Sequence, residues 1–301
     1  MSEFRLLVFD AFTDRPYSGN PCAIVMDADT LSSEQMQMIA AEINLSETVF
    51  VLSSEIALCR VRYFTPRTEI PYAGHPTIAT MFALAELGRI SLSSTNVTVD
   101  IECSIGVLPV ALEACDGKAV RAIMTQPAPT YGDFLDRETA SRVIGLTTSN
   151  LHPSSPPQVA GVGVPFLMIA VRDRETLLSL DPDWGALCQV CEEMELSGVY
   201  TYAPGGLSPM TSLCARFIDP FSRYEDPFTG SACGAMAALA LRNGVVAEAN
   251  LIVEQGESVG RIGRATVCLH DVEKNILVGG SAARVLSGTI CSPPDSSSGA
   301  T

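Results

Sequence analysis

The sequence predicts an α+β protein built from two similar halves, and three observations lead to this prediction. First, segments 74–88 and 230–244 each begin with glycine, continue through small apolar residues and end with glycine at the same spacing. Second, strand and helix patterns precede each segment in the same order. Third, a chain of 301 residues has the length of about two domains of ~150 residues each. The two segments predict equivalent helices whose N-termini face each other across an anion-binding pocket.

The first half alternates between strand and helix patterns. Ser32 and Gln35 have the spacing of a capping box, and apolar residues then recur every three or four positions, which is typical of an amphipathic helix. Short runs rich in β-branched and aromatic residues predict strands. The expected strands are 6–9, 22–26, 48–52 and 57–64, followed after the first repeated segment by a hairpin of 97–101 and 106–113.

The second half repeats this order. Its expected elements are strands at 159–163 and 166–171, a helix at 184–195, and strands at 198–202 and 213–218. The second repeated segment follows them. In the first repeated segment, Pro76 suits the first turn of a helix and Gly88 suits its end.

A Gln-Pro-Ala-Pro run at 126–129 interrupts the pattern and predicts the domain boundary. We expect an N-terminal domain of residues 1–125 and a C-terminal domain of residues 126–288. The final strand belongs either to the second domain or returns to the first. Residues 289–301, which are rich in serine and proline, predict a disordered tail.

Composition narrows the classes of function. The chain is 47% hydrophobic and 18% charged, with a formal net charge of −15. Without a basic patch, nucleic acid is not an expected partner. No apolar run reaches the ~18–20 residues of a membrane span, and the first residues do not resemble a signal peptide. Ten cysteines without a secretory signal predict reduced, mostly buried thiols and a cytoplasmic protein.

Among the three histidines, His75 lies at a predicted helix start. The free N–H groups and the positive dipole end there favour a neutral imidazole that donates a hydrogen bond or relays a proton. A structural role fits the same position. His152, in a Pro/Ser-rich loop, and His270, beside Asp271, are expected to be structural or exposed.

Two carboxylates and one hydroxyl are candidates for the site. Glu47, between a predicted helix and an apolar strand, is either a solvated loop residue or a general base whose pKa partial burial raises from ~4.3. Asp226 either forms an Asx turn before Pro227 or is a second carboxylate facing Glu47 or His75. Ser231, the counterpart of His75, is either the helix N-cap or a donor to a substrate carboxylate.

Other motifs give little sign of a cofactor. Cys188 and Cys191 form an isolated C-x-x-C, and zinc sites usually need a second ligand pair, so these two residues are expected to be buried thiols. The chain has no phosphate-binding loop, dinucleotide fingerprint or G-x-S-x-G motif. We therefore predict chemistry without a metal or an organic cofactor.

Four motifs, taken together, resemble the PhzF family, which comprises the phenazine-biosynthesis isomerase and its homologues. This family shares its two-domain architecture with diaminopimelate epimerase and proline racemase. The matching stretches are 9–12 with 16–21, 44–48, 64–66 with 69–76, and 225–232. Their common order makes the resemblance specific.

The resemblance implies two α+β domains, each a mixed sheet or open barrel around a central helix, with the active site in the interdomain cleft. It implies that Glu47 is the general acid/base and that His75 and Asp226 complete the catalytic set. It also implies a homodimer and no metal or organic cofactor. The residues matched to substrate binding are Asn20, Ser46, Gly74, Gly230 and Ser231.

One departure from related enzymes narrows the reaction. Epimerases and racemases of this architecture carry a cysteine at the start of each central helix, where this chain has Ala73 and Thr229. A racemase with two thiol bases is therefore not expected, and one that uses Cys233 is a weaker alternative. A single carboxylate base favours removal and return of a proton on one face.

The resulting hypothesis is a cofactor-independent isomerase of a small biosynthetic metabolite, acting by a 1,3-proton shift, tautomerisation or epimerisation. The alternative is a non-catalytic protein on the same scaffold that binds a small molecule or regulates another protein. The presence of Glu47, His75 and Asp226 together favours the enzyme.

Overall fold

In the computed structural model, which describes residues 2–294, both repeated segments form helices of thirteen residues. They are α2 (Gly74–Glu86) and α6 (Gly230–Arg242), and ten of the thirteen residues in each are buried. Gly88 and Gly244 follow the two helices with the same φ of 69°, a left-handed conformation that glycine adopts without strain. The start and end predicted for each helix are thereby confirmed.

The chain divides into two units. Unit 1 contains the described residues up to Met124 and those from Gly279 onward, and unit 2 contains Thr125–Val278. The final strand, β18 (Ala282–Cys291), pairs with β1 (Glu3–Ala11) and so belongs to unit 1. The predicted tail boundary at 288 falls inside this strand, while residues 295–301 lie outside the described residues.

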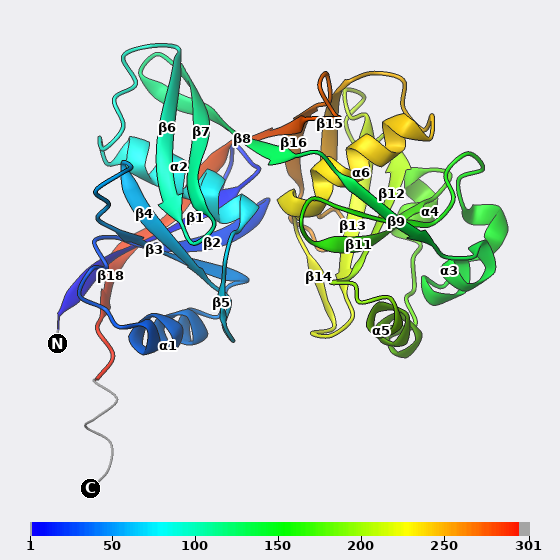
Figure 1. Ribbon diagram of the computed structural model, residues 1–301, viewed down its shortest axis with the longest axis horizontal. Helices are drawn as coiled ribbons and strands as arrows, with labels where there is room; N and C mark the ends of the chain where they lie inside the picture. Colours follow the sequence, from blue (N-terminus) through cyan, green and yellow to red (C-terminus); the bar gives the residue numbers. More distant parts are fainter. Residues whose placement is uncertain (1, 295–301) are drawn as a thin grey trace, which may run out of the picture. The chain divides into compact units, whose positions relative to one another are not determined.

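Unit 1 surrounds α2 with strands, as Figure 1 shows for the cyan helix, and α2 contacts β1, β2, β3 and β18. The helix α1 (Ser33–Ile43) has the predicted capping box of Ser32 and Gln35. The remaining strands of this unit are β2 (Asn20–Val25), β3 (Glu47–Leu52), β4 (Cys59–Phe64), β5 (Glu69–Ile70), β6 (Asn96–Cys103), β7 (Gly106–Cys115) and β8 (Lys118–Pro127), whose last three residues belong to unit 2.

Unit 2 surrounds α6, the yellow helix of Figure 1, which contacts β10, β11, β12 and β16. Its strands are β9 (Thr130–Phe134), β10 (Gln158–Gly161), β11 (Pro165–Ala170), β12 (Val199–Pro204), β13 (Leu213–Asp219), β14 (Tyr224–Asp226), β15 (Asn250–Gln255), β16 (Gly263–Cys268) and β17 (Asn275–Gly280), whose last two residues belong to unit 1. Its other helices are α3 (Arg137–Val143), the 3₁₀ helix Thr148–Asn150, α4 (Arg174–Leu178) and α5 (Trp184–Glu193).

The strand pairings of unit 2 repeat those of unit 1 in the same order. In unit 1, β2 is parallel to β3, β3 antiparallel to β4, β4 antiparallel to β5 but parallel to β6, and β6 antiparallel to β7. In unit 2, β11, β12, β13, β14, β15 and β16 form the same succession of pairs. Each central helix follows the short strand, β5 or β14. Both units are therefore mixed sheets built on one plan.

The repeat extends to single residues. Arg62 on β4 donates to Glu69 on β5 through Nε and Nη2, at 2.8 and 2.7 Å. Arg216 on β13 donates to Glu225 on β14 in the same way, at 2.9 and 2.8 Å. Five residues after each glutamate comes the glycine that begins the central helix. These matched pairs fix which residue of unit 1 corresponds to which residue of unit 2.

One expectation needs correction. Residues 126 and 127 do not break the structure but end β8, and β9 begins three residues later at Thr130. The side chain of Gln126 fits a strand because it is buried and hydrogen-bonded. Several elements lacked a sufficient pattern to be predicted, among them β8, β9, α3, α4 and the strands after α6.

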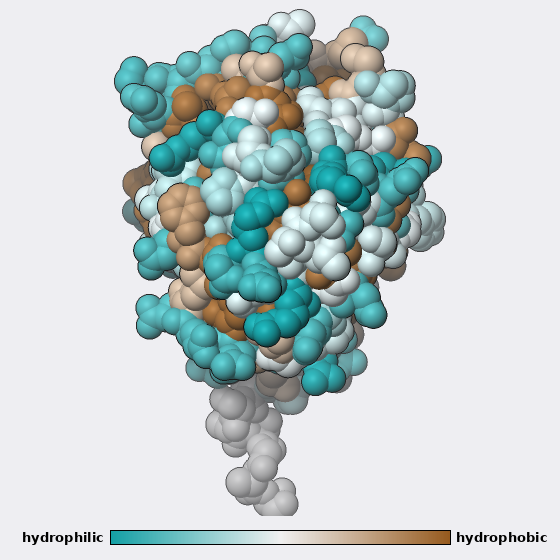
Figure 2. All heavy atoms as spheres, turned by 90° about the vertical axis from the view of Figure 1, so that its right-hand side faces the viewer, coloured by the Kyte–Doolittle hydropathy of each residue, from teal (hydrophilic) through white to brown (hydrophobic). Residues whose placement is uncertain are grey.

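The surface of unit 2 mixes polar and apolar residues on the face seen in Figure 2, where teal and white areas are interspersed with smaller brown ones. In the part of the chain that the structure describes, no helix is both long and apolar enough to cross a membrane.

Candidate active site

In unit 1, three elements begin beside one another: β2 at Asn20, β3 at Glu47 and α2 at Gly74. β2 and β3 run parallel, with Cys22 opposite Glu47. Because parallel strands start at the same edge of a sheet, Asn20 and Glu47 share that edge. His75, the second residue of α2, meets both.

The side chains of Asn20, Ser46, Glu47 and His75 form a connected group. Nε2 of His75 lies 3.2 Å from Oε2 of Glu47, and its Nδ1 lies 3.4 Å from Nδ2 of Asn20. Ser46 Oγ donates to Oδ1 of Asn20 at 3.5 Å. An amide nitrogen can only donate, so in this orientation of Asn20 the Nδ1 atom accepts and the imidazole proton is on Nε2, facing Glu47.

Glu47 is held partly out of water, with 21% of its side chain exposed. Burial raises the pKa of Glu47 to about 7, against a smaller lowering by the hydrogen bond from Ser46. Within the described residues its Oε2 has no well-aligned hydrogen bond, and Nε2 of His75 lies 3.2 Å from it. A carboxyl group with a pKa near 7 can both take up and return a proton at neutral pH.

Sequence reasoning missed Cys22, which lies opposite Glu47. Its thiol is fully buried. Burial, with a smaller contribution from the charge of Glu47, raises the pKa of Cys22 well above its usual value. The thiol therefore stays neutral and does not compete with Glu47 as a base. Only the parallel register of β2 and β3 reveals this neighbour.

The starts of the two central helices differ from those of the other α-helices. The N-cap residues of α2 and α6, Ala73 and Thr229, make no side-chain capping bond. Side chains cap the other four α-helices, and these caps are Ser32, Asp136, Asp173 and Asp183. The expectation that Ser231 is the N-cap is wrong, because it is the second residue of α6.

In unit 2, the segment 226–231 brings Asp226, Gly230 and Ser231 together at the start of α6. Thr229 Oγ1 donates to Oδ2 of Asp226 at 2.5 Å, and this bond takes the hydroxyl away from the helix. Gln126 Nε2 donates to the Gly230 carbonyl at 2.9 Å. The half-buried Ser231 follows in the first turn, where uncapped N–H groups attract an anion.

The remaining predicted residues lie elsewhere. His152 is half-buried with Nδ1 3.1 Å from Ser154 Oγ, and His270 is exposed. On α5, Cys191 is buried as expected, but Cys188 is only half-buried because it lies on the less covered side of this surface helix. Among the described residues, no group of three or more His, Cys, Asp or Glu side chains could hold a metal ion.

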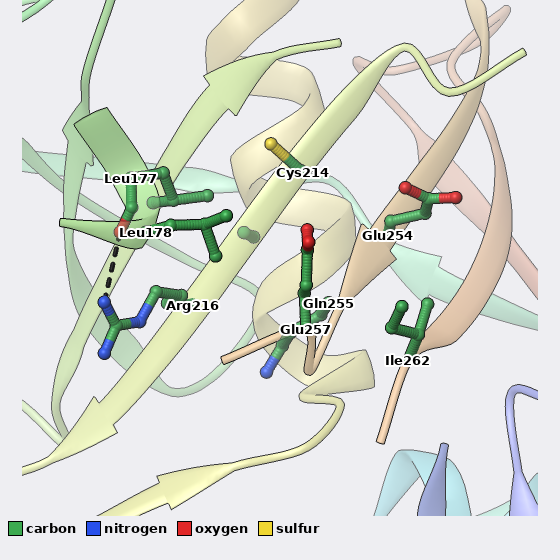
Figure 3. A pocket seen from close by; sticks show the side chains of 9 residues that line it. Leu177, Leu178, Cys214, Arg216, Glu254, Gln255, Glu257 and Ile262 are labelled. Atoms are coloured by element: carbon green, nitrogen blue, oxygen red, sulfur yellow. Dashed lines mark hydrogen bonds between the residues drawn. The ribbon is translucent and has the colours of Figure 1, made fainter. Parts of the chain in front are cut away.

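A small pocket in unit 2 contains none of the predicted site residues. It is lined by residues of α4, β13, β15 and the segment after β15 (Figure 3), and its carboxylates, Glu254 and Glu257, are paired with Arg264 and Arg174. Arg216 turns to the Leu177 carbonyl, as the dashed line in Figure 3 shows, at 3.1 Å. The charged side chains that line this pocket are thus engaged in holding unit 2 together.

A family model described as "Phenazine biosynthesis-like protein", PhzC-PhzF, matches residues 9–288. The chain belongs to this family. It is 35% identical over 263 residues to the trans-2,3-dihydro-3-hydroxyanthranilate isomerase of Pseudomonas aeruginosa, covering 86% of this chain and 88% of the relative. It is therefore, by homology, an isomerase of the PhzF family.

Solved structures agree with this assignment. A PhzF-family phenazine biosynthesis protein from Bacillus anthracis matches with a TM-score of 0.87 and 31% identity, covering 97% of this chain and all of that one. A hydroxyproline epimerase from Agrobacterium vitis, at 12% identity, has a TM-score of 0.65 over 96% of this chain and 91% of its own, which shows a common fold alone. The predicted relationship to epimerase-like folds is thereby confirmed.

Proposed function

We propose that this PhzF-family isomerase moves a proton within a small metabolite and that Glu47 removes and returns that proton. The observation that carries the proposal is Glu47 itself, a partly buried carboxyl with a pKa of about 7 beside the His75 imidazole. The ionised carboxylate takes a proton from carbon, the C–H electron pair forms a new double bond to the neighbouring carbon, and the electron pair of the original double bond moves to the far carbon. The carboxylic acid then gives a proton to another carbon, so no oxidant or cofactor is consumed.

The other candidate residues support this step in different ways. His75, with its proton on Nε2, stabilises the carboxylate form of Glu47. The first turns of α2 and α6, at Gly74 and at Gly230–Ser231, offer N–H groups to a substrate anion and to negative charge that develops on it. Asp226 acts in the same reaction as a hydrogen-bond acceptor for the substrate. A homodimer and a cytoplasmic location remain parts of the proposal.

The substrate of the Pseudomonas relative, trans-2,3-dihydro-3-hydroxyanthranilate, is the first compound to test. Incubation in D₂O with the wild-type protein should place deuterium in the product, as NMR or mass spectrometry detects. Glu47→Gln should fold normally and reduce incorporation roughly 10²–10⁴-fold, the usual contribution of a general base.

Glu69→Gln is the matched control, because Glu69 is an exposed carboxylate of the same unit that pairs with Arg62. It should leave incorporation unchanged. Undiminished incorporation by Glu47→Gln would remove this residue from the mechanism. Tight binding of the compound without exchange in the wild-type protein would favour the non-catalytic alternative.

A further inference from the structure

A chain of hydrogen-bonded side chains leads to Asp226 from within unit 2. The Tyr200 hydroxyl donates to Oε1 of Gln255 at 2.7 Å, and the Thr229 backbone N–H donates to the same oxygen at 3.1 Å. Nε2 of Gln255 donates to the Asp226 carbonyl at 2.8 Å and to Thr229 Oγ1 at 3.2 Å. Thr229 Oγ1 in turn donates to Oδ2 of Asp226 at 2.5 Å.

These contacts fix the direction of every proton in the chain. Oε1 of Gln255 accepts two bonds and Nε2 donates two, so the amide has one satisfactory orientation. Thr229 Oγ1 already accepts from Gln255, and its single proton therefore goes to Asp226. A hydrogen bond donated to a carboxylate favours the ionised form.

Two members of this hydrogen-bonded chain are buried, and a third, Thr229, lies where a side chain usually makes a different bond. Tyr200 is 0% exposed and Gln255 is 2% exposed. Thr229 is the N-cap of α6, where a threonine hydroxyl ordinarily accepts from the first turn of its helix. Here the hydroxyl is committed to Asp226 instead, which leaves the helix start uncapped.

Unit 1 shows that the fold does not require this chain of hydrogen-bonded side chains. Matching the two units through their arginine–glutamate pairs and strand registers gives an apolar or thiol counterpart for each member. The counterparts of Tyr200, Gln255, Thr229 and Asp226 are Val49, Cys103, Ala73 and Ile70. Because the same strands and helix form without these polar groups in unit 1, packing alone does not explain them in unit 2.

We propose that Gln255 is a positioning residue which, through the Thr229 hydroxyl, presents Asp226 to the reaction as an ionised hydrogen-bond acceptor. The proposal rests on the proposed function in assuming that Asp226 takes part in the reaction. Neither Gln255 nor Thr229 needs to touch the substrate for this role.

The neighbouring ionisable groups of unit 2 are either neutral or bound to other partners. Asp226 is therefore the carboxylate whose charge the hydrogen-bonded chain affects. Burial raises the pKa of Tyr200 well above its usual value, with smaller contributions from Cys233, Asp226 and Cys214. Burial raises the pKa of both thiols to about 12, so all three are neutral at pH 7. Glu225, the adjacent carboxylate, is bound by Arg216 and by the Ser258 hydroxyl.

Carboxyl NMR tests the proposal without a substrate. In protein labelled with ¹³C at the aspartate side-chain carboxyl, Asp226→Asn identifies the resonance of Asp226. Thr229→Val and Gln255→Met should move the titration of this resonance to higher pH. Thr229→Ser, which restores the hydroxyl, should return it to the wild-type position.

Gln158→Met is the matched control, since Gln158 is another buried glutamine of unit 2, with Nε2 bonded to the Gly132 carbonyl. It should leave the titration unchanged. An unchanged titration in Thr229→Val, or an equal shift in Gln158→Met, overturns the proposal. If Gln255→Met does not fold, Tyr200→Phe replaces it, because this variant removes one hydroxyl and keeps the ring.

Kinetics separates failure of this proposal from failure of the proposed function. With the dihydro-hydroxyanthranilate as probe, Gln255→Met should lower kcat about tenfold with little change in KM, and should cost little more in an Asp226→Asn background. If Gln255→Met lowers kcat about tenfold both in the wild-type protein and in the Asp226→Asn variant, Gln255 does not act through Asp226. Wild-type kcat in Asp226→Asn would refute the role of Asp226 in the reaction, while the NMR result would still decide whether the chain controls its charge.

Discussion

We expect Glu47 and His75 to act as a pair because Oε2 of the carboxyl and Nε2 of the imidazole lie 3.2 Å apart. The Nε2 proton of His75 faces the carboxylate, and the Asn20 amide keeps Nδ1 as an acceptor. The start of α2 disfavours an imidazolium ion at this place. We therefore expect proton transfer to fall to Glu47. This interpretation assigns Asn20 to holding His75, where the sequence motif predicts substrate binding.

The pH dependence of the reaction tests this division of roles. Glu47 must be ionised to take a proton, and its pKa is about 7. We expect kcat/KM to rise with pH through about 7 and to level off above it, as measured by initial rates from pH ~5 to ~9. Glu69→Gln should show the same profile. A profile that stays flat across this range would contradict a base at Glu47.

Some site residues could be predicted from sequence and others could not. Glu47 and His75 lie in contiguous motifs next to a strand and a helix start, where local chemistry is readable. Gln255 follows Asp226 by 29 residues, and the role that we propose for it depends on the parallel pairing of β13 with β15. A buried glutamine at the end of a strand has no local signal that distinguishes it from a packing residue.

At the scale of elements, the repeat gives both units the same frame but different contents. The strand registers match Glu47 of unit 1 with Gly198 of unit 2. A Cβ at Gly198 would lie 2.7 Å from the Phe217 ring and from the Ile218 carbonyl, so no carboxylate fits there. The repeated strands and helices were predictable from the glycines of the two segments. The difference between Glu47 and Gly198 was not, because it depends on the Phe217 ring that fills the space beside Gly198.

The contact of Gln126 with α6, within unit 2, yields a prediction for Gly234. A Cβ there would lie 2.1 Å from Oε1 of Gln126, whose Nε2 holds the Gly230 carbonyl. Gly234→Ala should therefore displace Gln126, lower the melting temperature and reduce activity through the start of α6. The cost should be on the order of 1–3 kcal/mol, as is typical of overpacking.

Gly185→Ala is the control for this change. Gly185 is exposed near the start of α5, and a Cβ there would meet only Asp183 Oδ1, at an ordinary 3.5 Å. Replacing glycine by alanine in a helix should stabilise by roughly 0.5–1 kcal/mol. Equal melting temperatures for the Gly234→Ala and wild-type proteins would show that Gln126 yields freely.

For the whole molecule, Glu47 links stability to pH. Burial raises the pKa of Glu47 from an ordinary value of 4.5 to about 7 in the folded protein, so the folded state binds more protons than the unfolded state between these values. The contribution of Glu47 to stability is therefore fullest below about pH 4.5 and is lost as pH rises through about 7, a change of about 3 kcal/mol in total. Glu47→Gln should be more stable than the wild type at pH ~8, with the advantage vanishing near pH ~4.

Urea unfolding at several pH values measures this effect. Glu69→Gln should behave in the opposite way, because Arg62 lowers the pKa of Glu69 and the stabilisation it gives is present at high pH and lost on acidification. A constant difference between Glu47→Gln and the wild type at every pH would show that burial does not perturb Glu47.

The pairing of β1 with β18 has a consequence for biosynthesis. Glu3 lies opposite Cys291, and all of unit 2 lies between these strands along the chain. A ribosome releases the polypeptide from its N-terminus, so every residue of unit 2 emerges before β18 does. Unit 2 can fold as one continuous stretch during translation, whereas the sheet around α2 must wait for its last strand. The unit that carries Glu47 is thus the first to be synthesised and the last to be completed.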